Sequence, residues 1–183
     1  FTVKSVYRDG YQTGGVTVRV TPRVFFAPGE LKTYDLGSVV FSMNYVPEVE
    51  FLIGHVDEQR TTLSARPYED DLVDGFFIGE TEVTYRLWNT VATWAEADGY
   101  ELSSELAQMG FSGDENCTYQ HPVTKVTWEM ALVWCNALTE YCNAAIGTEM
   151  QCVYTDSIGR PHRDQGAVHY SILEVDWLAD GFR

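Results

Sequence analysis

Apolar side chains recur every three or four residues in two segments of the chain, the spacing of an amphipathic helix. In the first segment they follow Thr84, whose hydroxyl can cap a helix, and they stop at Gly99. In the second they follow Thr127 and stop at Gly147. The pattern predicts helices over about 84–98 and 128–145. The residues expected on their buried faces are Leu87, Trp88, Val91, Ala131, Cys135 and Leu138.

Strand patterns dominate the start of the chain. Apolar and polar residues alternate over Val16–Val20, as in a strand with one buried face. The turn Thr13-Gly14-Gly15 separates this strand from another predicted at Thr2–Tyr7. We therefore interpret residues 1–37 as an appended β segment and residues 38–183 as the main domain.

Outside the two helices, the main domain has less regular structure in its pattern. Short strands are predicted at Gly75–Gly79 and at Cys152–Tyr154. After Tyr154 the sequence predicts a long loop, from Thr155 to Arg183, rich in Asp, Gly, His and Arg. Loops of this length without structure of their own are usually functional or ordered by a partner.

The net charge of the chain disfavours some classes of partner. The chain has 27 acidic and 12 basic residues and a net charge of −15, so it repels phosphate backbones and anionic lipid surfaces. We expect no nucleic-acid partner, and we expect basic or neutral partners instead. The hydrophobic share of 45% is enough for a packed core. No apolar run of about 18 residues occurs, so we expect no transmembrane segment.

Several short motifs occur in a fixed order along the main domain. They are Phe51-Leu52-Ile53-Gly54, then Glu82-Val83-Thr84 with Trp88, then His121-Pro122-Val123, then Val126-Thr127-Trp128, and finally Gly181-Phe182-Arg183. Together they resemble the formylglycine-generating enzyme or sulfatase-modifying factor family. The sequence departs from the family at Glu48-Val49, where two glycines are common.

The resemblance implies an α+β, C-type-lectin-like fold, with two amphipathic helices on a small antiparallel sheet. In the family, Gly-Phe-Arg is followed by Leu-Pro-Thr-Glu, and most functional residues come later. We therefore expect residues 38–183 to form the N-terminal part of this fold. We expect them to pack against the C-terminal remainder of the same fold. The resemblance also implies copper-binding cysteines in that remainder, and it allows structural calcium in the complete domain. We expect no cofactor, metal site or catalytic residue within residues 1–183.

Two functions are compatible with the resemblance. The scaffold serves as a non-catalytic display fold in the variable proteins of diversity-generating retroelements, which bind proteins or other macromolecules. The alternative is an oxidase that converts a sulfatase cysteine to formylglycine. We favour the binding protein, exported to the cell envelope or cell surface. The long polar insertions, the added β segment and the acidic surface fit such a binder, and a fold does not fix a function.

The reactive side chains have structural interpretations as well as functional ones. Cys135 and Cys142 lie seven residues apart on one helical face, as small core residues do, although Cys142 and Cys152 also flank a short connection that a disulfide could close. His121 occupies a structural position of the family motif. His162 and His169 are expected in a solvated loop.

Other candidates are acidic or aromatic. The cluster Glu69–Asp74 lacks the spacing of a calcium loop and is expected to be a solvated turn. The tryptophans assigned to the core are Trp88, Trp94, Trp128 and Trp134. Trp177 lies instead in the terminal loop beside Asp176 and Asp180, and we predict that these three residues contact a ligand.

Overall fold

The computed structural model describes residues 26–49, 74–103, 106–110, 116–167 and 173–183, together with the backbone of four strand pieces at 2–3, 16–17, 52–53 and 68–69. Every structural statement below concerns these residues. They form an α+β fold with two helices and small antiparallel sheets, as the sequence predicts. His55, His169 and most of the acidic cluster at 69–74 lie outside the described residues.

The two helices begin and end within one residue of the predicted bounds. Helix α1 (Tyr85–Ala97) is capped by Thr84, whose hydroxyl accepts a hydrogen bond from the Leu87 amide at 3.2 Å. Helix α2 (Trp128–Ile146) is capped in the same way by Thr127. It ends at Gly147, which has a left-handed φ of 68°.

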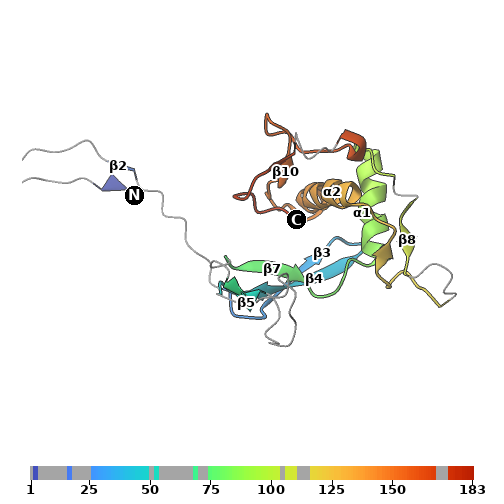
Figure 1. The fold of residues 1–183 in the computed structure, drawn as a ribbon, viewed down its shortest axis with the longest axis horizontal. Coiled ribbons are helices and arrows are strands. Elements are labelled where there is room, and N and C mark those ends of the chain that lie inside the picture. The colour runs from blue at the N-terminus through green and yellow to red at the C-terminus, as the bar shows by residue number, and fades with distance from the viewer. Residues whose placement is uncertain are drawn as a thin grey trace, which may run out of the picture.

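A three-stranded antiparallel sheet lies on one side of α2 (Figure 1). Its strands β3 (Leu31–Asp35), β4 (Val40–Val46) and β7 (Phe76–Gly79) are ordered β3-β4-β7. Tyr34 of β3 stacks on Phe41 of β4 with ring centroids 4.8 Å apart. The predicted division between residues 37 and 38 falls in the turn that joins β3 to β4.

The remaining strands are two residues long and pair as antiparallel couples. They are β1 (Thr2–Val3) with β2 (Val16–Thr17), β5 (Leu52–Ile53) with β6 (Tyr68–Glu69), β8 (Gln108–Met109) with β9 (Val123–Thr124), and β10 (Tyr154–Thr155) with β11 (Glu174–Val175). The first pair lies within the predicted N-terminal hairpin. Strand β10 begins two residues later than the sequence predicts.

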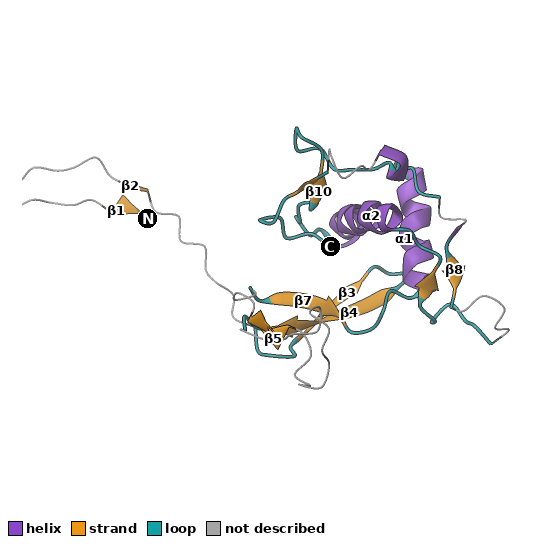
Figure 2. Cartoon of the chain, in the orientation of Figure 1, coloured by secondary structure: helices purple, strands orange, loops and turns teal. Residues whose placement is uncertain are grey.

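Helix α2 lies at the centre of the arrangement. In Figure 1 it is seen nearly end-on, with α1 crossing beside it, the sheet below it and β10 above it. Figure 2 shows that the segments above α2 are mostly loop. The helices meet at Trp88 and Trp134, whose rings stack at 5.1 Å and 6°, and the Trp134 indole N–H donates to the Trp88 carbonyl at 3.2 Å. This contact joins α1 to α2 in the core.

Some predicted core residues are less buried than expected. Leu87, Trp88, Val91 and Leu138 are buried, but Ala131 and Cys135 are only half-buried. The fully buried positions of α2 include Met130, Val133, Asn136, Ala137 and Thr139. The reason is that α2 is covered on two sides, by α1 and by the loops, so its buried surface is wider than one stripe and is displaced from the predicted one.

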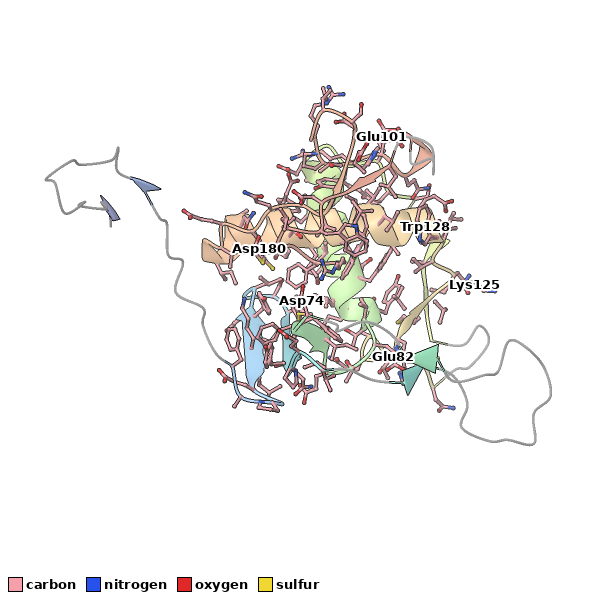
Figure 3. All side chains as sticks on the ribbon, turned by 60° about the vertical axis from the view of Figure 1, so that its left-hand side comes forward. Asp74, Glu82, Glu101, Lys125, Trp128 and Asp180 are labelled. Atoms are coloured by element: carbon pink, nitrogen blue, oxygen red, sulfur yellow. The ribbon has the colours of Figure 1, made fainter. Side chains whose placement is uncertain are left out.

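The tryptophan assignments also need a correction. Trp88 and Trp134 are buried, Trp94 is half-buried, and Trp128 is 41% exposed. Trp128 is the first residue of α2 and lies at the end of the helix, beyond the crossing with α1 (Figure 3). An apolar side chain at a helix start therefore does not share the burial of the helix interior.

The segment after Tyr154 is more ordered than the predicted long loop. It contains β11, a 3-10 helix η3 (Gln165–Ala167) and a turn in which the Asp156 carboxylate accepts from the amides of Ile158 and Arg160. His162, predicted to be solvated, is only 7% exposed. In the parts of the chain that the structure describes, no helix is long and apolar enough to cross a membrane.

Replacing Trp88 with alanine should lower the free energy of unfolding by about 3–5 kcal/mol, because the change removes a buried ring and its stacking on Trp134. Chemical denaturation followed by circular dichroism measures the loss. Trp177→Ala is the matched control, since that ring is 72% exposed and its loss should cost less than about 0.5 kcal/mol. Equal effects of the two substitutions would contradict the core assignment.

Candidate functional site

A cavity of about 1030 Å³ separates the sheet from α2. Its apolar walls come from four parts of the fold: strand β4, the start of α1, helix α2 and the C-terminal segment. The main apolar lining residues are Phe41, Met43, Leu87, Cys135, Leu138 and Phe182. The volume is at the upper end of the range found for small-molecule pockets.

The alternation of β4 explains the sheet side of the cavity. Successive side chains of a strand point to opposite faces, so Phe41 and Met43 share one face. Tyr34 stacks beside Phe41, and Phe182 meets both rings edge-on at 5.3 and 5.8 Å. These aromatic contacts connect the sheet to the C-terminal segment.

The C-terminal segment is held on α2 by a hydrogen bond to a helix side chain and by close packing. The Phe182 amide donates to the Thr139 hydroxyl at 3.0 Å, and that hydroxyl donates to the Cys135 carbonyl at 2.9 Å. Gly181 lies so close to α2 and to the loop after it that a Cβ there would clash with the Gln151 carbonyl of the loop and stand 2.9 Å from Thr139 Oγ1 of the helix. Only glycine fits this close approach.

Charged and polar residues also line the cavity. Glu82 contributes from the segment before α1, Arg86 from the first turn of α1, and Arg183 from beside Phe182. Figure 3 shows Glu82 on the sheet side of the molecule and Asp180 beside α2. Apolar walls with charged groups among them are suited to binding by burial of apolar surface, with the charges selecting the orientation of the bound group.

Sequence reasoning missed Asn136, the polar residue that organises the far side of α2. Its side chain is fully buried. Its amide donates to the carbonyls of Tyr154 at 2.7 Å and His162 at 3.0 Å, and its carbonyl oxygen accepts from the Tyr154 amide at 3.3 Å. The available signal was an asparagine between Cys135 and Ala137 on the apolar side of a predicted helix, because a buried amide must find hydrogen-bond partners.

An ion-pair network lies where α1, α2 and the following loop meet. Arg163 contacts the Glu140 carboxylate at 2.8 Å and donates to the Asp98 carbonyl at 3.0 Å. The Tyr100 hydroxyl donates to the same Glu140 carboxylate, and the Arg163 guanidinium lies over the Tyr100 ring at 4.9 Å. Burial, followed by the hydrogen bond to Glu140, raises the pKa of Tyr100 above its usual range. The network therefore keeps a neutral phenol beside an ion pair, which suits a structural crosslink.

The three predicted ligand contacts lie at one turn but differ in role. Asp176 accepts a hydrogen bond from the Leu178 amide at 2.9 Å, and Asp180 accepts from the Gln151 amide at 2.9 Å. Trp177 is 72% exposed between them. Arg183 lies over its ring at 5.5 Å and also lines the cavity, so the turn and the cavity are adjacent.

His121 has the structural role that its motif implies. Its Nδ1 lies 2.9 Å from the Thr118 amide nitrogen, which donates to it, and its carbonyl accepts from the Tyr85 amide at 2.8 Å. The second bond fixes the loop to the first turn of α1. Within the described residues, no group of three or more His, Cys, Asp or Glu side chains is placed to hold a metal ion.

None of the four cysteines forms a disulfide in the structure. Burial raises the pKa values of Cys135, Cys142 and Cys152 to about 12, so these thiols stay protonated at neutral pH. A protonated thiol is a poor nucleophile and a poor metal ligand. The disulfide between Cys142 and Cys152, left open by the sequence, is not formed here.

Comparisons with known proteins identify one family and several similar solved structures. The sulfatase-modifying factor enzyme 1-like domain matches residues 37–169. The crystal structure of CarF has a TM-score of 0.57 at 25% identity, covering 76% of this chain and 50% of that chain. Treponema denticola variable protein 1 has a TM-score of 0.55 at 29% identity, covering 84% of this chain and 52% of that chain. This chain thus spans about half the length of both structures. No curated protein matches it significantly.

Replacing Gly181 with alanine should destabilise the protein by about 1–3 kcal/mol, because the new methyl group cannot fit against Gln151 and Thr139. Denaturant unfolding measures the effect. Gly166→Ala is the control, since its Cβ would approach only the Asp164 carboxylate, at 3.2 Å. A Gly181→Ala protein as stable as the control would show that the C-terminal segment does not pack on α2.

Alkylation should distinguish native from unfolded thiols. At pH 8 we expect iodoacetamide to modify Cys135, Cys142 and Cys152 slowly in the native protein, because thiols with pKa values of about 12 are protonated there. Since folding raises these pKa values, the thiols favour the native state below their unfolded pKa, and that stability is lost as the pH rises through the native values. In denaturant without reductant all four cysteines should react, as peptide mapping would show. Two unmodified cysteines there would instead indicate a disulfide.

Proposed function

Since the chain belongs to the sulfatase-modifying factor enzyme 1-like domain family, we propose that it is a non-catalytic, ligand-binding display protein on a C-type-lectin-like scaffold. The observation that carries this proposal is the likeness to Treponema denticola variable protein 1, which extends over most of this chain. By analogy with the display scaffolds of diversity-generating retroelements, the bound ligand is a protein or another macromolecule. We assign most of the ligand contacts to the part of the fold that follows Arg183.

The state of the thiols disfavours copper chemistry at the cysteines of this part of the fold, whereas the family resemblance assigns the catalytic cysteines to the part that follows it. Converting a cysteine to formylglycine on a copper centre needs thiolates that are available to the metal. Burial raises the pKa values of three of the four cysteines here to about 12, which opposes that role. The alternative function, a formylglycine-generating oxidase, is favoured by the name of the family itself.

The cavity supports a proposal about the nearest partner. Its walls are apolar on the sheet, on α2 and on Phe182, and apolar surface of this kind is stabilised by contact with further polypeptide. This chain also spans about half the length of the solved structures that resemble it. We propose that the C-terminal remainder of the same fold packs into the cavity.

The proposal includes two properties implied by the family resemblance. One is export to the cell envelope or cell surface, where a display protein meets its ligands. The other is structural calcium in the complete domain. Bound calcium would stabilise the native state by mass action, so the melting temperature of the intact protein should fall in EDTA and recover when calcium is added.

Two assays on the intact protein separate the candidate functions. We expect selection from a phage-displayed random peptide library to enrich a small set of peptides that compete with one another for the protein. We also expect no aldehyde to form on a cysteine-containing sulfatase peptide incubated with the protein, copper and oxygen, as followed by mass spectrometry. Aldehyde formation would overturn the proposal in favour of the oxidase.

A further inference from the structure

The turn after β11 presents two large apolar side chains to solvent. Trp177 is 72% exposed and Leu178 is 96% exposed, the two highest values among the large hydrophobic residues that the structure describes. Burying a tryptophan at an interface contributes strongly to binding, because its large ring loses little conformational entropy. Adjacent exposed Trp and Leu side chains are therefore the surface feature of this molecule best suited to contact a partner.

The turn that carries these side chains is held firmly by the rest of the fold. The Asp176 amide donates to the Val153 carbonyl at 2.9 Å, and the Ala179 amide donates to the Asp176 carbonyl at 3.2 Å. The carboxylates of Asp176 and Asp180 accept from the backbone at 2.9 Å. Because the backbone is already ordered, a partner that binds here pays little entropy to fix the turn.

Charge and ring chemistry indicate what kind of group fits. Residues 173–183 contain three carboxylates, from Glu174, Asp176 and Asp180, and one cation, Arg183. That cation lies over the Trp177 ring at 5.5 Å, so the indole face already attracts a guanidinium within this molecule. With Arg183 in place the residue is still 72% exposed, which leaves much of the ring accessible.

We propose that the Trp177–Leu178 turn is the docking site for a protein partner that presents a cationic, arginine- or lysine-bearing segment. A cationic side chain of the partner stacks on the accessible part of the Trp177 ring, and the carboxylates of Asp176 and Asp180 attract it. Leu178 contacts the apolar part of the same segment. The net charge of −15 attracts such a partner over a longer distance. The inference rests on the proposed binding function and names the partner class for it.

The test measures binding of an arginine-rich peptide, and of its citrulline counterpart, to the intact protein by isothermal titration calorimetry. Citrulline keeps the shape of arginine without its charge, so we expect the arginine peptide to bind at least about ten-fold more tightly. We expect Trp177→Ala to weaken binding of the arginine peptide about ten-fold. Raised salt should weaken it further.

One further test variant and one matched control complete the experiment. Asp180→Asn keeps a side-chain oxygen that can accept from Gln151 but removes the charge, so it should weaken binding about three-fold with unchanged stability. Ile158→Ala removes a side chain that is 71% exposed at a different turn and should leave binding unchanged. Equal loss from Ile158→Ala and Trp177→Ala would overturn the assignment of this site.

The outcomes separate this inference from the proposed function. If the intact protein enriches specific library peptides, but their binding is insensitive to Trp177→Ala and to salt, the docking site is wrong and the binding function stands. Preferential enrichment of acidic peptides or of uncharged apolar peptides would likewise overturn the cationic partner. If the protein forms aldehyde and enriches no peptide, the proposed function itself fails.

Discussion

The buried side chain of Asn136 is the interaction on which the arrangement around α2 depends. A fully buried amide in the middle of a helix must be hydrogen-bonded, and here all the partners of the side chain are backbone groups of the segment after Gly147. One residue of α2 thus orders a stretch of chain that has little regular structure. The strand pair β10 and β11, and the turn that follows β11, take their positions from this connection.

The helices could be predicted from the sequence because their signals are local. A capping threonine, apolar residues every three or four positions and a terminal glycine define α1 and α2 without any knowledge of distant contacts. Burial was predicted less well. The half-buried positions of Ala131 and Cys135 and the exposed ring of Trp128 depend on which elements cover α2 and where they end, which is a property of the tertiary structure.

The candidate site, too, could be predicted from the sequence only in part. Trp177 could be singled out because an aromatic residue among acidic ones in a polar segment has no obvious place in a core. Its assignment as a ligand contact, with Asp176 and Asp180, remains a prediction. The cavity could not be predicted, because its walls come from β4, α1, α2 and Phe182, which lie far apart along the chain. The burial of His162 was missed because its partner, Asn136, lies 26 residues earlier.

The turn around Trp177 has a consequence for how this surface can change over time. Its conformation is fixed by backbone hydrogen bonds and by the carboxylates of Asp176 and Asp180, whereas the side chains at 177 and 178 point to solvent and carry little of the fold. Substitutions at these two positions are therefore nearly neutral for folding and can be selected for recognition alone. Gly181 and Phe182, three to five residues further on, have no such freedom. A short stretch of sequence thus contains neighbouring positions on which folding places very different constraints, free at 177 and 178 and strict at 181 and 182.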